Sequence, residues 1–276
     1  MKIFDDFLYY SGSESTMEFK TSVANTTKDE IFVHGYNLTE DLIGEITLAD
    51  MAFLGAKHRK PTQEESKMLN AIMVAISEHG FTPSSISARL TYLGSPEAVQ
   101  AAIASGILGA GTVYLGAMEY VAEMVQTAWQ ENPNAAVEAL AAKVLKERKE
   151  KGLQLPGFGH PIHKPEDPRT TKLFALAKEL GFYNKHSELL MEIHRQFCEE
   201  KGKTITLNVT GAIGAIMSDM DFHYKVVKTF GVGARAIGLI AHIVEEIEYG
   251  RKESIGQQLF DFVEENTDYK SPQQEE

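Results

Sequence analysis

The sequence predicts an all-α protein, and three observations point to that class. Apolar residues recur at intervals of three and four along most of the chain, as they do on one face of a helix. Capping signals precede several of these stretches, and Thr62 followed by Glu65 has the spacing of a capping box. Strand-like patterns are limited to the short segments 30–35 and 204–209, so strand content is expected to be minor. The second segment could instead be an extended lead into the helix at 211–218.

Composition limits what the protein can be. The chain has 276 residues, of which 43% are hydrophobic and 24% charged, so it can bury one large core or form two unequal lobes. A single cysteine, Cys198, excludes an internal disulfide framework and a Cys-based zinc site, and it suits a reducing, cytoplasmic location. The net charge of −12, from 27 basic and 39 acidic residues, argues against binding to nucleic acid or to an anionic membrane.

No targeting or membrane segment is expected. The N-terminus lacks the basic-then-apolar order of a signal peptide. The uncharged stretch 98–118 is long enough to span a bilayer, but it contains four glycines and no long block of Leu, Ile or Phe. We expect a closely packed helical pair there, which also suits an interface between copies of the chain.

The expected helices follow from caps, breaks and apolar spacing. Thr39 and Thr62 stand at N-cap positions, with acidic residues in the turns that follow. Asn132-Pro133-Asn134 breaks the chain, and Gly231-Val232-Gly233 is expected to interrupt the longest helix. Residues 1–29 are polar and are expected to be irregular and flexible. Helices are expected over residues 39–44, 48–54, 62–79, 85–93, 96–107, 113–130, 135–149, 169–180, 187–201, 211–218, 222–249 and 254–264.

The segment from Pro156 to Arg169 is the strongest candidate for a functional loop. Its glycines let the backbone approach a ligand, and its prolines restrict its conformations. His160, Lys164 and Arg169 offer an imidazole, an ammonium and a guanidinium within ten positions. Such a set could donate to a developing oxyanion and bind two anionic groups. The alternative is a rigid surface connection with incidental charges.

Two further positions suggest a binding site. His79 ends one helix and Thr82-Pro83-Ser84 opens the next, whose free N–H groups would suit a carboxylate or a thioester oxygen. Alternatively, His79 is only a C-terminal residue favoured by the helix dipole. Arg235 lies in an apolar stretch where an unpaired guanidinium is costly. It therefore either pairs with an acid such as Glu119 or Asp219, or binds an anionic ligand.

No metal site is expected from the histidine spacing. His186 and His194 are eight residues apart, without the spacing of four that places two ligands together on a helix, and we expect them on an exposed face. Gly231-Val232-Gly233 follows no strand and is therefore no nucleotide-binding fingerprint.

Three separated motifs resemble the citrate synthase superfamily over about residues 35–265. Gly157-Phe158-Gly159-His160, with Asp167-Pro168-Arg169 following, is similar to the family signature Gly-X-Gly-His…Asp-Pro-Arg. His79 with Ser84 and Arg89 resembles the first substrate-binding histidine segment, and Arg235 resembles the arginine on the large-lobe helix. The short chain resembles the lyase branch, which contains citryl-CoA lyase and the citryl-CoA-cleaving domain of ATP-citrate lyase.

The resemblance implies a role for each matching residue. His160 would donate a hydrogen bond to the carbonyl oxygen of an oxo-acid and stabilise alkoxide character there. His79 and Ser84 would contact the same substrate. Arg169 and Arg235 would bind its carboxylates in paired fashion.

A coenzyme A thioester is implied as substrate, not as a permanently bound cofactor. The adenine would lie against the backbone of Gly157, Phe158 and Gly159. Lys164 and Lys203 would meet the phosphates.

The family fold also implies a division into lobes. Residues 1–29 would be a flexible segment, 30–130 with 223–276 a large helical lobe, and 131–222 a small one, with the ligand in the cleft between the lobes. The partners implied are an acyl-CoA and an oxo-acid, together with a second copy of the chain in a homodimer or higher homo-oligomer.

Two positions depart from the family pattern. Tyr114 stands where the synthases place a histidine that polarises the thioester; the lyase branch also lacks it, and a phenol or a backbone group could serve. The family motif Asn-Val-Asp is here Asn208-Val209-Thr210. A threonine hydroxyl cannot replace the aspartate as acid or base, and such a loss typically costs about 100- to 10,000-fold in rate. The candidates to supply the proton are Tyr114, Glu78, Glu119, Asp219 or a bound water.

Three functions remain open from the sequence. The first is retro-aldol cleavage of a carboxylated 3-hydroxyacyl-CoA, with citryl-CoA to acetyl-CoA and oxaloacetate as the reference case. The second is a condensing acyltransferase that runs the same site in the opposite direction. The third is a non-catalytic acyl-CoA-binding paralogue, for which Thr210 is the main argument.

Overall fold

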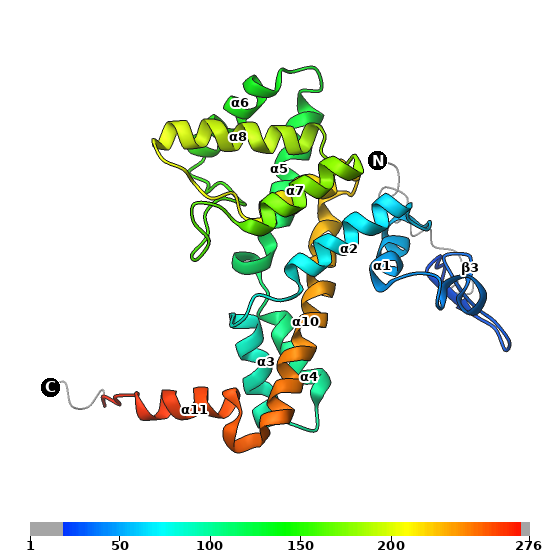
Figure 1. Ribbon diagram of the computed structural model, residues 1–276, viewed down its shortest axis with the longest axis vertical. Helices are drawn as coiled ribbons and strands as arrows, with labels where there is room; N and C mark the ends of the chain where they lie inside the picture. Colours follow the sequence, from blue (N-terminus) through cyan, green and yellow to red (C-terminus); the bar gives the residue numbers. More distant parts are fainter. Residues whose placement is uncertain (1–18, 272–276) are drawn as a thin grey trace, which may run out of the picture. The chain divides into compact units, whose positions relative to one another are not determined.

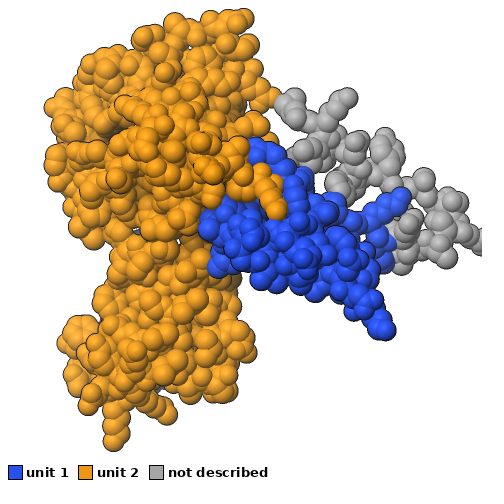
Figure 2. All heavy atoms as spheres, turned by 45° about the vertical axis from the view of Figure 1, so that its right-hand side comes forward, with its two compact units in different colours: residues 1–59 blue, residues 60–276 orange. Residues whose placement is uncertain are grey.

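The computed structural model describes residues 19–271 and confirms the all-α prediction (Figure 1). The chain divides into two compact units, residues 1–59 and 60–276, which Figure 2 colours separately. The lobe boundaries at 130/131 and 222/223 stay a prediction.

Unit 1 carries the strands of the described part of the chain. β1 (Ala24–Thr26), β2 (Ile31–Val33) and β3 (Tyr36–Asn37) form an antiparallel sheet in that order. β1 lies within the segment 1–29 that the sequence predicts to be irregular; residues 1–18 of that segment lie outside the described residues. The sheet therefore begins earlier than the expected strand at 30–35.

Two helical segments follow the sheet in unit 1. η1 (Leu38–Leu42) is a π-helical turn, and its cap is Asn37 instead of the expected Thr39. The Asn37 side chain accepts hydrogen bonds from Thr39 N and Glu40 N, at 3.0 and 3.2 Å. The next helix, α1 (Leu48–Lys57), begins at a capping box formed by Thr47 and Asp50.

Helices make up the regular structure of unit 2 among its described residues. They are α2 (Gln63–Ser77), α3 (Pro83–Gly94), α4 (Val99–Leu108), the π-helical turn η2 (Thr112–Gly116), α5 (Ala117–Glu131), α6 (Val137–Glu150), α7 (Pro168–Leu180), α8 (Lys185–Lys201), α9 (Val209–Asp219), α10 (Tyr224–Glu253) and α11 (Ile255–Glu265). The start of α2 confirms the capping box, since Thr62 accepts from Glu65 N and Glu65 accepts from Thr62 N. The segment 204–209 is an extended approach to α9 with one isolated bridge, Phe158 to Leu207, and not a strand.

α10 is the central helix of unit 2 (Figure 1). Its N-terminal half packs against α2 and α5, and its C-terminal half against α3 and α4. The predicted interruption at Gly231–Gly233 is wrong: the helix continues, and Gly231 lets Met118 of α5 approach, because a Cβ there would lie 3.0 Å from Met118 Cε. The backbone leaves helical geometry at Gly250 instead, where φ is 69°.

The two apolar segments that raise the membrane question are packed helices. α10 is long and apolar enough to cross a membrane by length and composition, but half of its most apolar 18-residue window is buried inside the protein. The stretch 98–118 is split between α4, η2 and the start of α5. Within it, Gly106 lies against Leu239, where a Cβ would come within 2.6 Å of Cδ1. Glycine therefore serves close packing here, as the composition predicts.

Gly238→Ala is expected to destabilise the protein by about 3 kcal/mol through overpacking. A Cβ at this position would lie 1.9 Å from the carbonyl oxygen of Ser77, where α10 crosses the end of α2. Gly233→Ala in the same helix is the matched control, because the nearest atom lies 3.9 Å away. Removing a helical glycine there should stabilise by about 0.5–1 kcal/mol. Urea unfolding measures both, and equal effects would contradict the packing argument.

Candidate active site

The loop between α6 and α7 is held in place by the segment that leads into α9. Gly159 N donates to Thr206 O at 2.7 Å, and Asn208 N donates to Gly157 O at 3.0 Å. The side-chain amide of Asn208 donates to Gly159 O at 2.9 Å. Gly157 is required because its φ is 82° and a Cβ would lie 2.7 Å from the Cα of Gly211. The loop is thus fixed at its glycines, directly before His160.

The local backbone sets the orientation and tautomer of His160. Its Nδ1 accepts hydrogen bonds from the backbone N–H groups of Ile162 and His163, at 3.1 and 2.9 Å. A neutral imidazole that accepts at Nδ1 carries its proton on Nε2. His160 therefore offers an N–H donor at Nε2, which is the function that the sequence predicts for it.

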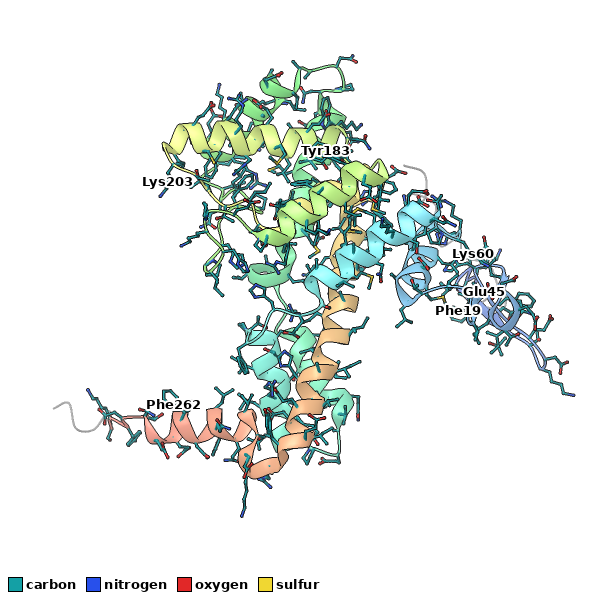
Figure 3. The ribbon with its side chains drawn as sticks, in the orientation of Figure 1. Phe19, Glu45, Lys60, Tyr183, Lys203 and Phe262 are labelled. Carbon is teal, nitrogen blue, oxygen red and sulfur yellow. The ribbon has the colours of Figure 1, made fainter. Side chains whose placement is uncertain are left out.

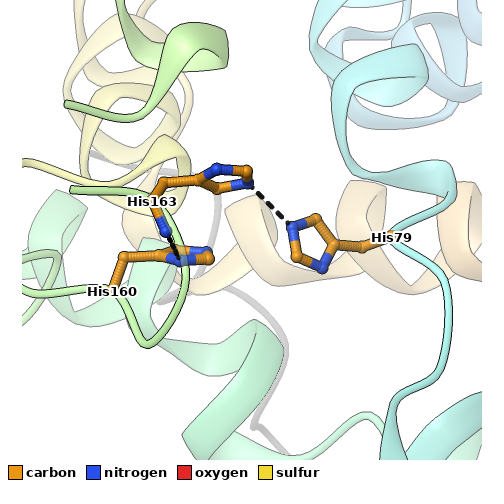
Figure 4. Close-up of side chains that lie close together, drawn as sticks. All are labelled: His79, His160 and His163. Carbon is orange, nitrogen blue, oxygen red and sulfur yellow. Dashed lines mark hydrogen bonds between the residues drawn. The ribbon is translucent and has the colours of Figure 1, made fainter.

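Three imidazoles from two elements meet in front of this loop (Figure 4). His79, from the turn between α2 and α3, lies with its ring centre 5.5 Å from that of His160 and 5.4 Å from that of His163. His79 Nε2 and His163 Nε2 are 3.3 Å apart, and the His160 and His163 rings are 4.5 Å apart. His163 is a site residue that the sequence did not predict. It follows His160 by three residues, but both lie in a loop, where spacing does not determine which way a side chain points.

The same cluster is the group of described residues that could hold a metal ion. One ring nitrogen from each of His79, His160 and His163 lies within 4.8 Å of the others. The prediction of no metal site was argued from the spacing of His186 and His194, which are not part of this cluster. Those two histidines are half-buried instead of exposed: His186 Nδ1 lies 2.9 Å from Asp219 Oδ1, and His194 Nε2 lies 2.6 Å from Ile205 O.

Arg169 stands at the start of α7 and is oriented by a buried carboxylate. Its Nε and NH2 groups donate to the two oxygens of Asp167, at 3.0 and 2.9 Å. Asp167 also accepts from Val209 N at 3.0 Å, which joins α7 to α9. Burial alone would raise the pKa of Asp167, but the bonds and charge of Arg169 hold it below its ordinary value. The guanidinium still reaches the cluster, with NH2 3.5 Å from His160 Nε2.

Arg235 approaches from α10 with a donor unused. The residue is 8% exposed, and its buried NH1 has no hydrogen-bond partner among the described residues. The acid beside it is Glu78, whose Oε2 lies 4.0 Å from NH1, so neither Glu119 nor Asp219 is its partner. Glu78 already accepts from the N–H groups of His79 and Gly80, at 2.8 and 2.7 Å. A buried donor without an acceptor suits an anionic ligand.

Burial and neighbouring cations lower the pKa of two imidazoles of the site, His79 and His160. Burial lowers the pKa of His79 below 6.5, and the charges of Arg169 and Arg235 lower it further, while Asp167 opposes them. Burial and the neighbouring His163 lower the pKa of His160 as well. Burial is also the main cause of the lowered pKa of Arg235, and Arg169 adds to it. Two guanidiniums that face the same imidazoles repel one another until an anion lies between them.

A cavity of about 510 Å³ is lined by Phe158 of the loop between α6 and α7. Its wall contains Phe158 and Lys203, the latter just beyond the end of α8 (Figure 3). Phe158 is stacked on His194, with ring centres 5.8 Å apart. The remaining cations of the wall are Arg148, Lys149 and Lys201. Lys164 is exposed and does not belong to this wall. The structure thus brings Lys203 and Phe158 together, but not Lys164.

Three other expected residues have different surroundings. Ser84 is 3% exposed, and its hydroxyl donates to Gly106 O at 2.6 Å, which favours a role in holding α4 against α3 over contact with a substrate. Thr210, in the first turn of α9, donates to Asn208 Oδ1 at 2.7 Å. Tyr114 belongs to η2, and its side chain lies outside the part that the structure describes.

Known proteins share this fold. The family model "Citrate synthase, C-terminal domain" matches residues 47–256. The structure of citryl-CoA lyase from Hydrogenobacter thermophilus has a TM-score of 0.79 and 31% identity, covering 92% of this chain and 94% of that chain. ATP citrate lyase from Methanosaeta concilii, in complex with (3S)-citryl-CoA, has a TM-score of 0.74 at 20% identity, covering 95% of this chain and 43% of that chain, and it shows the fold alone.

Curated relatives share the sequence over part of their length. Citrate synthase from Heyndrickxia coagulans is 30% identical over 200 residues, covering 70% of this chain and 50% of that protein. Citrate synthase from Acidithiobacillus ferridurans is 26% identical over 201 residues, with the same coverage of 70% and 50%. The chain thus spans about half the length of these relatives.

Proposed function

Because the chain belongs to the citrate synthase family, we propose that it breaks a carbon–carbon bond in a carboxylated 3-hydroxyacyl-CoA. The reference case is citryl-CoA, which gives acetyl-CoA and oxaloacetate. The observation that carries the proposal is that the charges of Arg169 and Arg235 both act on the imidazole of His79, and that Arg169 NH2 also lies 3.5 Å from His160 Nε2. That arrangement supplies two carboxylate-binding groups beside a hydrogen-bond donor for a carbonyl oxygen.

The reaction uses the donor of His160 where negative charge develops. Loss of the 3-hydroxyl proton gives an alkoxide, which collapses to the carbonyl of the oxo-acid as the neighbouring carbon–carbon bond breaks. His160 Nε2–H stabilises that oxygen, while Arg169 and Arg235 hold the carboxylates at either side. The donor is fixed by two backbone hydrogen bonds to Nδ1, so it needs no reorganisation during the reaction.

We propose that coenzyme A binds on the other side of the loop, in the cavity at Phe158 and Lys203. The wall of the cavity carries four cations and one acid, Glu200, which pairs with Lys149 at 2.7 Å, in a protein with a net charge of −12. Such a local concentration of positive charge suits the phosphates of coenzyme A. We propose that the pantetheine chain passes from this cavity along Gly157–Gly159 to the histidines.

The direction of the reaction is proposed as cleavage. The similarity to citryl-CoA lyase extends over 94% of that chain, whereas the curated citrate synthases are matched over about half of their length. The same groups could also serve condensation, in which an acyl-CoA enolate attacks the oxo-acid. A non-catalytic acyl-CoA-binding protein is the third candidate, and Thr210 is the observation that favours it.

We also propose a cytoplasmic homodimer or higher homo-oligomer, for which the exposed apolar side chains of α10 and α11 would provide an interface.

Incubation of the purified protein with citryl-CoA should release acetyl-CoA and oxaloacetate, with condensation of the two products slower under the same conditions. Mass spectrometry of the CoA esters measures both directions. Calorimetry with acetyl-CoA is the companion measurement. Binding of the ester without turnover of any carboxylated 3-hydroxyacyl-CoA would refute an enzymatic role and favour the binding protein.

A further inference from the structure

The proposed function leaves the proton of the 3-hydroxyl group without an acceptor. His160 is unsuited, because its Nδ1 is occupied by two backbone donors and its Nε2 already carries the proton. Thr210 is unsuited as well, since its hydroxyl has no usable acid or base strength near neutral pH and donates to Asn208. The acceptor is therefore another group of the site.

The carboxylates near the histidines are already engaged. Asp167 is fully buried and binds Arg169 through both of its oxygens. Glu78 accepts two backbone N–H groups and lies 3.0 Å from His242 Nε2. The pKa of each carboxylate is held below its ordinary value, so each is a weak base. Neither is matched to the removal of a hydroxyl proton.

His163 has the freedom that these groups lack. Among the described residues, its ring makes one polar contact, between its Nε2 and His79 Nε2 at 3.3 Å. Two facing ring nitrogens make a hydrogen bond only when one is protonated and the other is not. No backbone group determines which of the two carries the proton. The pair can therefore accept a proton at one nitrogen and release it from another.

Charged groups surround the pair of His79 and His163. Arg169 and Arg235 face it from α7 and α10, and His160 and Asp167 from the loop. Glu78, at the end of α2, accepts from the backbone N–H of His79, and its carboxylate lies 3.0 Å from His242 Nε2 of α10. The two fixed guanidiniums disfavour an additional positive charge on the imidazoles while the site is empty. A bound dicarboxylate offsets them, and an imidazolium then becomes accessible during the reaction.

We propose that His163, paired with His79, is the acid–base residue of the site, in place of the family aspartate that Thr210 replaces. This inference rests on the proposed function. The imidazole takes the proton of the 3-hydroxyl group, and the hydroxyl oxygen becomes the carbonyl of the oxo-acid. The electron pair of the broken carbon–carbon bond passes to the thioester as an enolate. The imidazolium returns the same proton to the α-carbon, so an acyl-CoA and an oxo-acid form without another reactant.

His163→Gln tests the role, because glutamine keeps a polar group near the position of Nε2 but cannot take up a proton. We expect kcat for citryl-CoA cleavage to fall at least about 100-fold, with KM changed less than about threefold. The wild-type rate should fall as the pH drops and the imidazole becomes protonated, and the variant should lose this acidic limb. In His163→Ala, added imidazole should restore part of the rate, which a merely structural role would not allow.

The control uses a histidine pair of similar geometry outside the site. His34 Nδ1 and His58 Nδ1 lie 3.1 Å apart in unit 1, and His58→Gln should leave kcat and the pH profile unchanged. An unchanged kcat in His163→Gln would overturn the inference while the proposed function stood. Loss of wild-type activity with EDTA and its return with Zn²⁺ would also overturn it, since the three histidines would then be metal ligands. A wild-type protein that cleaves no carboxylated 3-hydroxyacyl-CoA would instead refute the proposed function itself.

Discussion

His160→Asn is expected to lower kcat/KM for citryl-CoA cleavage about 1,000-fold, the upper end of the effect of losing one donor to a developing oxyanion. The substitution distinguishes the structural role of Nδ1 from the catalytic role of Nε2. An asparagine oxygen can take the place of Nδ1 and accept from Ile162 N and His163 N, so the loop keeps its conformation. Nothing replaces the donor at Nε2. Steady-state kinetics measures the loss of kcat/KM. Calorimetry with acetyl-CoA measures the affinity for the ester, which should be retained.

His160→Gln is the matched variant, because its amide reaches the position of Nε2 but leaves the backbone donors of the loop unpaired. We expect it to retain more activity than His160→Asn, although its loop should be less stable. The opposite ranking would mean that His160 acts by shaping the loop. Equal, full activity in both variants would mean that the reacting oxygen lies elsewhere.

Arg89→Met is expected to destabilise the protein by about 3–5 kcal/mol, the typical cost of removing one partner of a buried ion pair. Arg89 is 1% exposed and binds the carboxylates of Glu245 and Glu246 and, at 3.1 Å, Nδ1 of His242. Glu246 is 2% exposed and also accepts from Gly256 N at 3.0 Å, so the group joins α3, α10 and α11. Without Arg89, the Glu246 carboxylate would be buried without a counter-charge. Urea unfolding measures the loss.

An exposed arginine that also binds two glutamates is the control. Arg195 on α8 binds Glu192 and Glu199 at 2.6 Å each, and its side chain is 53% exposed. These bonds lower the pKa of Glu192 to about 2, but water screens an exposed pair, and Arg195→Met should change stability by less than about 1 kcal/mol. The double variant Arg89→Met/Glu246→Met should regain part of the loss, because no buried charge is left. If Arg195→Met cost as much as Arg89→Met, burial would not be the cause.

The helices were predictable because their signals are local. A cap such as Thr62 and the apolar spacing of α2 act within a few residues, so the sequence reads them directly. The predictions of local structure were wrong where contacts with residues distant in the sequence determine the backbone. Gly231 and Gly233 suggest a break, but the helix continues, and the close approach of Met118 from α5 favours a small residue at Gly231. At 204–209 the alternation left a strand and an extended lead into the next helix both open, and the structure has the extended lead, with a single bridge to Phe158.

The sequence alone carried the resemblance to the family, because each of its motifs lies within one loop or one helix. It could not assign partners to Arg235 or a role to His163, because both depend on which side chain approaches from another element. The tertiary structure decided that Glu78 and not Glu119 stands beside Arg235, and that His79 meets His163. The physical reason is range: caps and turns act over a few neighbouring residues, whereas a hydrogen bond or an ion pair joins residues 84 or 157 positions apart in the chain.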